Sequence, residues 1–350
     1  MRHLVTGGSG YVGSFIIKKL SSMNEKVISL DVLPPIKKLS NVTYIEDSII
    51  NQELIFDITK KVDYIHHNAA LVPLTKSNKD FQKVNVEGTK ILIKNAIRNN
   101  IKHFCHMSSS AVFGLPEELP LNNDSKRLPV EIYGQSKKDA EDFVLSSIAS
   151  NPSFSCSIVR PRTILGSERL GIFELLFRWI SEGKDIFVIG KANQPFQFAH
   201  INDIVNASVN SCLYLKRGVF NIGTLEFKSL TSDLNSLIQF SEKKSRIRHL
   251  PEKLSISGLT VLDKLGLSPF APWHYLTYHK PFYFDSNYVF KELNYRPYGS
   301  NLELLKESYN SFLLNKRLKV KEDNFSSPHN SKLKATLLDT ISSISTFMPF

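Results

Sequence analysis

The sequence has little of what marks a secreted, metal-binding or membrane-spanning protein. Its 350 residues include only three cysteines, which are odd in number, far apart and without metal-ligand spacing: Cys105, Cys156 and Cys212. We interpret them as reduced thiols of a cytoplasmic protein and expect no metal site. No uninterrupted apolar run is long enough to span a bilayer. The first predicted strand begins at Met1, which leaves no room for a signal peptide.

A concentrated basic patch is also missing, although the formal net charge is +11. Such a charge is typical of proteins that bind nucleic acid or membrane surfaces, but the lysines are mostly spread along the chain and no nucleic-acid-binding fingerprint occurs. We expect no nucleic-acid partner and interpret the chain as a basic protein that suits an anionic small-molecule substrate. With 42% hydrophobic residues and no internal repeats, it can bury one large domain or two intimate ones.

The first 13 residues, MRHLVTGGSGYVG, predict a strand, a glycine turn and the start of a helix. Gly7 permits a tight turn, Gly10 removes a side chain where a diphosphate approaches, and Gly13 lets the helix pack closely on the strand. Backbone N–H groups at a helix N-terminus favour a diphosphate at that position. Three glycines alone are a weak signal and also occur in ordinary turns. The flanking strand and helix favour a dinucleotide site.

Strands and helices alternate through the first half of the chain. The predicted strands lie at Val27–Val32, Asn41–Ile45, Val62–His66, His103–Met107 and Ser155–Arg160, and the predicted helices at Asn51–Thr59, Phe81–Asn99 and Tyr133–Ser150. The last of these helices has Asp139, Glu141 and Asp142 on its polar side. This alternation predicts a Rossmann-type α/β fold, a doubly wound parallel sheet with helices on both faces.

The rhythm changes after Gly166. The predicted helices are Leu170–Ser181, Ile201–Leu215, Leu230–Phe240, Leu254–Leu267 and Leu302–Leu314, the predicted strands are Ile186–Ile189 and Val219–Ile222, and Pro269–Phe284 is expected to be irregular. We predict a dinucleotide-binding Rossmann domain over residues 1–165, completed by segments around 200–224. A smaller, interleaved substrate-binding lobe is expected over 166–315.

Residues 316–350 form a separate tail. A basic cluster (Lys316, Arg317, Lys319 and Lys321) and a polar linker over 323–331 precede an apolar stripe, Leu333, Leu337, Ile341 and Ile344, on one face of a predicted helix. One hypothesis is that residues 333–348 attach to a membrane surface or a partner. The favoured alternatives are a helix packed on its own protein and a frayed terminus.

The chemistry is expected from three residues. Tyr133 and Lys137 are four apart on a predicted helix, so the phenol and the ammonium share one face. A nearby cation favours the phenolate, which would bring the pKa of Tyr133 towards neutral pH, where it can act as a base. Ser109 follows a strand and would hold the substrate oxygen. Ligands of open parallel sheets bind beyond the carboxyl ends of the strands, where the glycine turn and Ser109 are both expected.

With these residues the chain resembles the extended short-chain dehydrogenases/reductases, the NAD-dependent epimerase/dehydratase family, over roughly residues 1–312. The motifs that carry the resemblance are T-G-x-x-G-x-x-G (Thr6–Gly13), Asp31, H-x-A-A (His67–Ala70), N-V-x-G-T (Asn85–Thr89), S-S-x-V-F-G (Ser109–Gly114), Y-x-x-x-K (Tyr133–Lys137), R-P (Arg160-Pro161), H-x-x-D (His200–Asp203) and F-N-I-G (Phe220–Gly223). Together they are highly specific.

The resemblance implies that Tyr133 is the catalytic acid/base, with Lys137 beside it and Ser109, or in its place Ser110, on the reacting oxygen. It implies cofactor contacts from Gly7, Gly10, Tyr11, Val12, Gly13, Asp31, Asp47, Ser48, Ala69, Ala70, Asn85, Tyr133, Lys137 and Pro161. Asp31 would bind the adenosine ribose and repel a 2′-phosphate, which favours NAD over NADP. Lys37 and Lys38 keep NADP as a minor alternative. His66, His67, His200 and Asp203 are interpreted as structural.

The chain departs from the family where many members bind a nucleotide sugar. An Arg-Asp pair that holds the substrate diphosphate is replaced by Phe196-Gln197, and an aromatic ring cannot replace a guanidinium on phosphate. Arg162 offers another anion contact, and substrate contacts are expected from Val72, Ser110 and Arg162. The segments Leu71–Thr75 and Phe270–Tyr283 suggest an apolar wall. A sugar conjugate other than a UDP-sugar, or a lipid-linked or sterol-like alcohol, fits these features.

We therefore predict NAD-dependent oxidation and reduction of a secondary alcohol on a sugar or sugar conjugate, in a sugar epimerase. A dehydrogenase or reductase of a lipid-linked or sterol-like alcohol is the alternative. A non-catalytic NAD-binding scaffold is a third hypothesis, against which the complete set of Ser109, Tyr133 and Lys137 argues. A homodimer formed through two helices is typical of the family.

Overall fold

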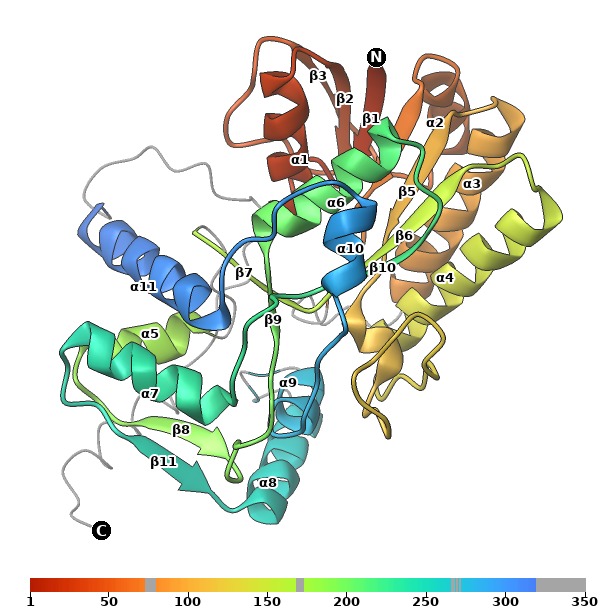
Figure 1. The fold of residues 1–350 in the computed structure, drawn as a ribbon. Helices are drawn as coiled ribbons and strands as arrows, with labels where there is room; N and C mark the ends of the chain where they lie inside the picture. Colours follow the sequence, from red (N-terminus) through yellow and green to blue (C-terminus); the bar gives the residue numbers. More distant parts are fainter. Residues whose placement is uncertain (73–79, 168–172, 266–267, 269, 271, 319–350) are drawn as a thin grey trace.

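The computed structural model describes residues 1–72, 80–167, 173–265, 268, 270 and 272–318 (Figure 1). The apolar stripe expected over 333–348 lies outside these residues, as do parts of the segments Leu71–Thr75, Leu170–Ser181 and Phe270–Tyr283. None of the helices in the described ranges is long and apolar enough to cross a membrane.

A seven-stranded, fully parallel sheet forms the centre of the fold. Its strands, in spatial order, are β10 (Gly218–Ile222), β6 (Cys156–Pro161), β5 (His103–Met107), β4 (Tyr64–His67), β1 (Arg2–Thr6), β2 (Lys26–Asp31) and β3 (Val42–Glu46). The Rossmann-type fold expected from the sequence is confirmed. The strand order reverses between β1 and β4, and such a reversal opens a crevice for a dinucleotide at the carboxyl ends of the strands.

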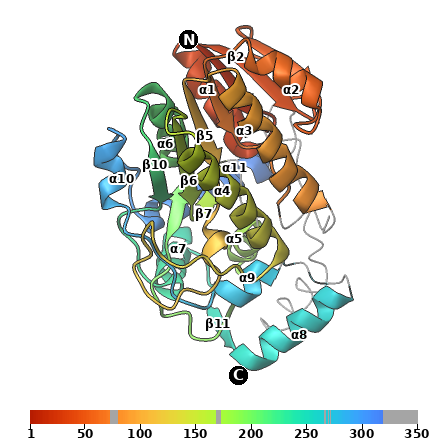
Figure 2. The ribbon, with the colours of Figure 1, turned by 90° about the vertical axis from the view of Figure 1, so that its right-hand side faces the viewer.

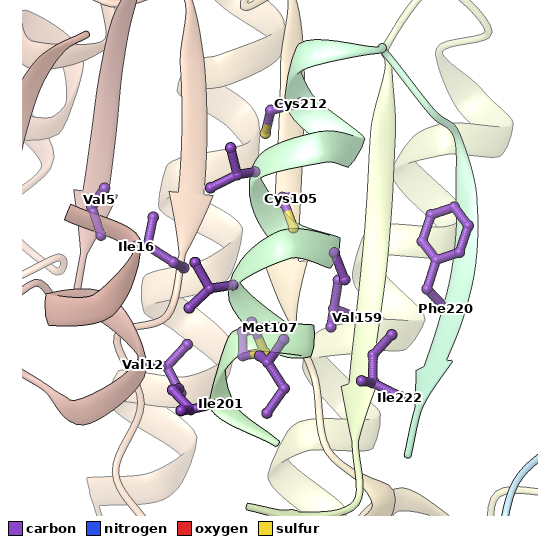
Figure 3. Packing of buried hydrophobic residues seen from close by; sticks show 14 of the residues in the cluster. Val5, Val12, Ile16, Cys105, Met107, Val159, Ile201, Cys212, Phe220 and Ile222 are labelled. Atoms are coloured by element: carbon purple, nitrogen blue, oxygen red, sulfur yellow. The ribbon is translucent and has the colours of Figure 1, made fainter. Parts of the chain in front are cut away.

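Helices cover both faces of the sheet. One face carries α1 (Tyr11–Ser22), α6 (Ile201–Leu213) and α10 (Asn287–Glu292), and the other carries α2 (Gln52–Thr59), α3 (Gly88–Arg98) and α4 (Ile132–Ser150). Adjacent residues of β1 supply the two cores: Val5 packs with the first group of helices and Leu4 with the second. Figure 3 shows the first core, where Val12 and Ile16 of α1 lie near Ile201 of α6. Both faces of a parallel strand are buried in this way.

The second lobe lies beyond the carboxyl ends of the strands in both Figure 1 and Figure 2. It contains α5 (Phe173–Ser181), α7 (Leu230–Ser241), α11 (Asn301–Leu318), α8 (Glu252–Lys264), α9 (Pro272–Thr277) and the parallel pair β8 (Ile186–Ile189) and β11 (Ile247–Leu250). A second short parallel pair, β7 (Thr163–Leu165) and β9 (Phe198–His200), leads into it. Phe173, Phe177, Trp179, Leu234 and Leu304 belong to its core.

Three differences from the sequence expectations concern long-range contacts. The segment expected to be irregular, 269–284, contains the short helix α9, whose Trp273 is buried against Phe282. The helix expected over 81–99 begins as a π-helix, η2 (Gln82–Glu87), before α3. The strand expected over 155–160 extends to Pro161, the last residue of β6, because Pro161 pairs with Ile222 of β10. Tertiary packing overrides local sequence preference at these places.

Candidate active site

The glycine turn after β1 forms a backbone cradle that side chains would fill. Gly7 has a φ of +67°, and a Cβ there would lie 2.7 Å from the backbone nitrogen of Ala69. A Cβ on Gly13 would lie 2.1 Å from the carbonyl oxygen of Gly7, so α1 begins directly against the turn. Gly10 is the N-cap of α1 and has no side chain to cover the first turn of the helix. This cradle fits the diphosphate of a dinucleotide.

A pocket opens beside the cradle at the end of β2. It is lined by Ser9, Ser29, Asp31, Leu33, Pro34, Pro35, Lys38, Tyr44, Ile45 and Glu46. The Asp31 carboxylate accepts hydrogen bonds from the backbone N–H groups of Ser9 (3.0 Å) and Leu33 (3.1 Å). Asp31 therefore orders the glycine turn, a role that the sequence analysis did not assign. A carboxylate offers about four lone-pair sites, so these two bonds are compatible with the ribose contact expected of it.

Other expected cofactor residues lie at or just after the carboxyl ends of β3, β4 and β6. The backbone N–H of Asp47 donates to the carbonyl of Asp31 at 3.0 Å, which places Asp47 and Ser48 beside the pocket. Ala69, Ala70 and Val72 follow β4 and are partly buried, and Pro161 lies in the buried end of β6. Their contacts with cofactor and substrate remain predictions.

Asn85 connects the loop after β4 to α4. Its side chain accepts from the N–H of Leu71 (2.8 Å) and donates to the carbonyl of Leu71 (3.2 Å) and to Ser136 Oγ (2.9 Å). Both amide hydrogens are used, and the residue is buried. These contacts are those of a positioning residue next to Lys137. The direct cofactor contact expected of Asn85 remains a prediction.

Lys137 brings α4 to the end of β5. Its Nζ donates to the carbonyl of Met107 at 2.5 Å, two residues before Ser109, and the side chain is 4% exposed. Burial lowers the pKa of Lys137 to about 8, whereas Glu141 acts to raise it. Ser109 is the N-cap of a 3₁₀ helix, η3 (Ser110–Phe113), and its Oγ accepts from the N–H of Ala111 at 3.1 Å. Tyr133 is partly buried and its ring lies 6.1 Å from that of Phe81.

Two residues that the sequence analysis missed determine how α4 begins. A Cβ on Gly134 would lie 2.6 Å from the carbonyl oxygen of Ala111, so the first turn of α4 lies directly against η3. Glu131 caps the helix by accepting from the N–H groups of Tyr133 (2.8 Å) and Gly134 (2.6 Å). Burial raises the pKa of Glu131, and these two hydrogen bonds oppose the shift. Together they hold the first turn of α4 against η3, and Tyr133 packs on the cluster that contains Ala111 and Val112 of η3.

Glu141 is fully buried, and its expected place on the polar side of α4 is wrong. Its carboxylate accepts from Ser108 Oγ (2.6 Å), from Nε and Nη2 of Arg160 (3.1 and 2.5 Å) and from Arg127 (2.9 Å). This network fastens α4 to the ends of β5 and β6. The i, i+4 spacing from Lys137 indicates that Glu141 shares the buried side of α4. Its arginine partners could not be predicted, because Arg127 and Arg160 lie outside the helix.

Arg162 and Phe196 meet at the boundary with the second lobe. Nη1 of Arg162 donates to Ser110 Oγ at 3.2 Å, and Cζ lies 4.0 Å from the ring centroid of Phe282 and 4.7 Å from that of Phe196. Phe196 is buried in the core of the lobe. Gln197 donates to the carbonyl of Thr224 (2.6 Å) and accepts from the N–H of Phe284 (2.8 Å). The two positions that differ from the family pattern therefore serve packing.

The histidines of the motifs are engaged within the protein. His67 lies between Thr6 Oγ1 and Thr89 Oγ1, each at 2.8 Å, and His66 contacts Ser208 Oγ at 2.9 Å. His200 caps α6, and Asp203 accepts from the N–H of Tyr298. These contacts support the structural interpretation of all four. Within the described ranges, no group of three or more histidine, cysteine, aspartate or glutamate side chains could hold a metal ion.

The doubly wound parallel sheet has a glycine cradle and a carboxylate at the end of β2, with Ser109 after β5 and Tyr133 and Lys137 on α4. Together these features are typical of a dinucleotide-dependent oxidoreductase of the Rossmann type. Residues 3–223 match the model of the NAD dependent epimerase/dehydratase family, and the chain belongs to this family. The resemblance found in the sequence, the enzyme class and the cofactor NAD are thereby confirmed.

Known proteins resemble the chain over most of its length. It is 34% identical to the uncharacterized protein y4nG of Sinorhizobium fredii over 335 residues, which cover 96% of this chain and 84% of that protein. It is 27% identical to a 3-beta-hydroxysteroid dehydrogenase of Mycolicibacterium neoaurum over 62% of each. The crystal structure of UDP-glucuronic acid 4-epimerase from Bacillus cereus in complex with NAD superposes with a TM-score of 0.73 and 21% identity, covering 90% of this chain and 99% of that one.

Proposed function

We propose that this enzyme oxidises and re-reduces a secondary alcohol on a sugar or sugar conjugate with NAD, as a sugar epimerase. The observation that carries the proposal is the position of the buried Lys137. Its ammonium donates to the carbonyl of Met107, two residues before Ser109, and it follows Tyr133 by one helical turn. The glycine cradle and the Asp31 pocket fit the cofactor. The similarity to a UDP-glucuronic acid 4-epimerase supports a sugar substrate.

The side chains divide the chemistry between them. Ser109 donates a hydrogen bond to the substrate oxygen, Tyr133 accepts the hydroxyl proton, and the Lys137 ammonium favours the phenolate of Tyr133. With a pKa of about 8, Lys137 is mostly protonated at neutral pH. Bound NAD would be held by the turn at Gly7 and Gly10, by Asp31 and by Lys137, and it supplies the hydride acceptor and donor.

Epimerisation fits this site better than dehydration. Elimination of water normally needs a second acid/base pair near Ser109. The next two residues are Ser110, which contacts Arg162, and Ala111, which is buried. A carbonyl intermediate that stays bound, turns over and is reduced on its other face gives the epimer. In the reduction step Tyr133 returns its proton to the substrate oxygen, which Ser109 still holds.

A dehydrogenase or reductase of a lipid-linked or sterol-like alcohol is the second candidate. Phe196 lies where many nucleotide-sugar enzymes of the family have an arginine, and its ring contacts that of Tyr278. Phe282 pairs with Phe196 and adds to this aromatic cluster. The similarity to a 3-beta-hydroxysteroid dehydrogenase supports this alternative. Release of the carbonyl product would distinguish it from an epimerase.

The test is Tyr133→Phe in the full-length protein, with the substrate identified by mass spectrometry of metabolites released on denaturation. We expect turnover to fall by about 10²–10⁴-fold while NAD still binds, because only the proton acceptor is removed. Tyr214→Phe, at a tyrosine that is 48% exposed, is the matched control and should retain full activity. Retained activity in Tyr133→Phe would refute the proposed mechanism.

We also infer that the enzyme acts in the cytoplasm and forms a homodimer. The three cysteines are buried free thiols, which suits a reducing compartment. The homodimer rests on the family resemblance alone. Light scattering of the purified protein tests it.

A further inference from the structure

Two buried arginines lie two residues apart at the end of β6, and they differ in how their charge is compensated. Arg160 makes two hydrogen bonds to the Glu141 carboxylate, at 2.5 and 3.1 Å. Arg162 is 2% exposed, and its one side-chain hydrogen bond in the described part of the chain goes to the neutral Ser110 at 3.2 Å. Its Nε is buried with no hydrogen-bond partner there, and no described carboxylate pairs with it.

The environment of Arg162 orients the guanidinium without neutralising it. The rings of Phe282 and Phe196 lie 4.0 and 4.7 Å from its Cζ, and such cation–π contacts offset part of the loss of hydration. The offset is incomplete, since burial lowers the pKa of Arg162 to about 9. A buried arginine normally has a carboxylate partner, as Arg160 has.

The position of Arg162 connects it to the catalytic residues. Ser110, to which it donates, directly follows Ser109 and lies in η3, against which α4 begins. Phe282 packs in the same small cluster as Phe113 of η3, with Tyr133 at its edge. A group bound by Arg162 and Ser110 therefore contacts the residue that directly follows Ser109.

We infer that Arg162 and Ser110 bind a carboxylate that the substrate carries close to its reacting carbon. This inference rests on the proposed function and names the class of its substrate, a hydroxy acid such as a uronic acid. The planar fork of one guanidinium matches one carboxylate, and the Ser110 hydroxyl beside it can donate to the same group. Phe196 stands where many family members have the arginine that holds the diphosphate, and its ring packs on Arg162.

The test compares ligands that differ only in the carboxylate. Full-length, NAD-loaded protein is titrated calorimetrically with D-glucuronate against D-glucose, and with UDP-glucuronic acid against UDP-glucose. We expect the carboxylated member of at least one pair to bind about tenfold more tightly or better. Arg162→Met should remove this preference and Arg162→Lys should keep part of it. Arg248→Met, at a half-buried arginine of β11 that pairs with Asp185, should leave this preference unchanged.

Several outcomes overturn the inference. These are equal affinity within each pair, no binding of either carboxylated probe, a preference that survives in Arg162→Met, and loss of NAD binding in Arg162→Met. If Arg162→Met does not fold, the wild-type comparison and Arg162→Lys decide. Tyr133-dependent turnover of an uncharged alcohol without a carboxylate preference refutes this inference alone. Absence of Tyr133-dependent turnover refutes the proposed function itself.

Discussion

The cofactor cradle depends on the absence of a side chain at Gly13. Gly13→Ala puts a Cβ 2.1 Å from the carbonyl oxygen of Gly7, and neither backbone segment can move without the other. We expect this substitution to lower the free energy of unfolding by at least about 1–3 kcal/mol, as overpacking does, and to weaken NAD binding about tenfold or more. Urea unfolding and fluorescence titration with NAD measure the two effects.

Gly258→Ala is the matched control for this prediction. Gly258 lies inside α8, where a Cβ would meet no atom within 4 Å. Alanine should therefore raise the free energy of unfolding by about 0.5–1 kcal/mol, because it favours the helix more than glycine does. NAD affinity should not change. A Gly13→Ala protein that binds NAD as tightly as the wild type would contradict the role of this close approach.

At the scale of one element, α4 carries the site. Tyr133, Lys137 and Glu141 recur every four residues, so they share one side of the helix. Glu141→Gln keeps the shape but leaves the buried Arg160 without its anion. We expect a loss of about 3–5 kcal/mol in the free energy of unfolding, the effect of breaking a buried ion pair. The pKa of Lys137 should also fall below its value of about 8, because Glu141 raises it. The alkaline limb of the pH–activity profile then moves to lower pH.

Asp142→Asn tests whether the effect belongs to the buried network. Asp142 is the next residue, its side chain is 40% exposed, and it pairs with Arg127 and Lys138. Exposed ion pairs contribute little, so we expect a change of at most about 1 kcal/mol and an unmoved pH profile. Equal losses in Glu141→Gln and Asp142→Asn would show that burial of the first carboxylate is not the cause.

The helix α4 also illustrates what sequence reasoning reaches. Its bounds and the pair Tyr133 and Lys137 follow from local spacing. The buried state of Glu141 does not, because its partner Arg160 is on another strand and periodicity alone treats a glutamate as exposed. A glycine at the start of a helix, such as Gly134, suggests a close contact. The contact itself is with the carbonyl of Ala111, on a segment distant in sequence, and could not be predicted. Residue spacing within one segment does not predict contacts with segments that are distant in sequence.

At the scale of the whole molecule the same distinction separates the sheet from the second lobe. The seven strands of the sheet were predicted because each is a short apolar run, and helical patterns alternate with these runs along the chain. The strands β7, β9 and β11 were not, since they pair only with partners brought near by the fold. The packing of Phe196 on Arg162 likewise depends on two segments that the fold brings together. An anion contact at Arg162 could therefore be predicted from the sequence, whereas the geometry around its guanidinium could not.

The central sheet also contains five buried histidines, which make stability depend on pH. Burial lowers the pKa of His3 and His103 to about 4 and that of His67 to about 3, and it lowers the pKa of His66 and His106 well below the usual value. The unfolded chain binds these protons near pH 6.5, so it takes up more protons than the folded chain as the pH falls. The stabilisation is present above pH 6.5 and is lost towards pH 4.

Each such histidine lowers the free energy of unfolding by about 2 kcal/mol between pH 7.5 and pH 5, and a protein of ordinary stability has only about 5–15 kcal/mol. Burial raises the pKa of Asp203 to about 6 and also raises the pKa values of Glu131 and Asp233, so these groups act in the opposite direction, but they are three carboxyls against five imidazoles. We expect acid unfolding near pH 5, measured as urea unfolding across pH 5–7.5. His103→Gln removes one titrating group and should reduce the slope, while His249→Gln, at an exposed histidine of β11, should not. A flat profile between pH 5 and 6.5 would mean that the histidines titrate alike in the folded and unfolded chains, and that the sheet is not what makes the protein sensitive to acid.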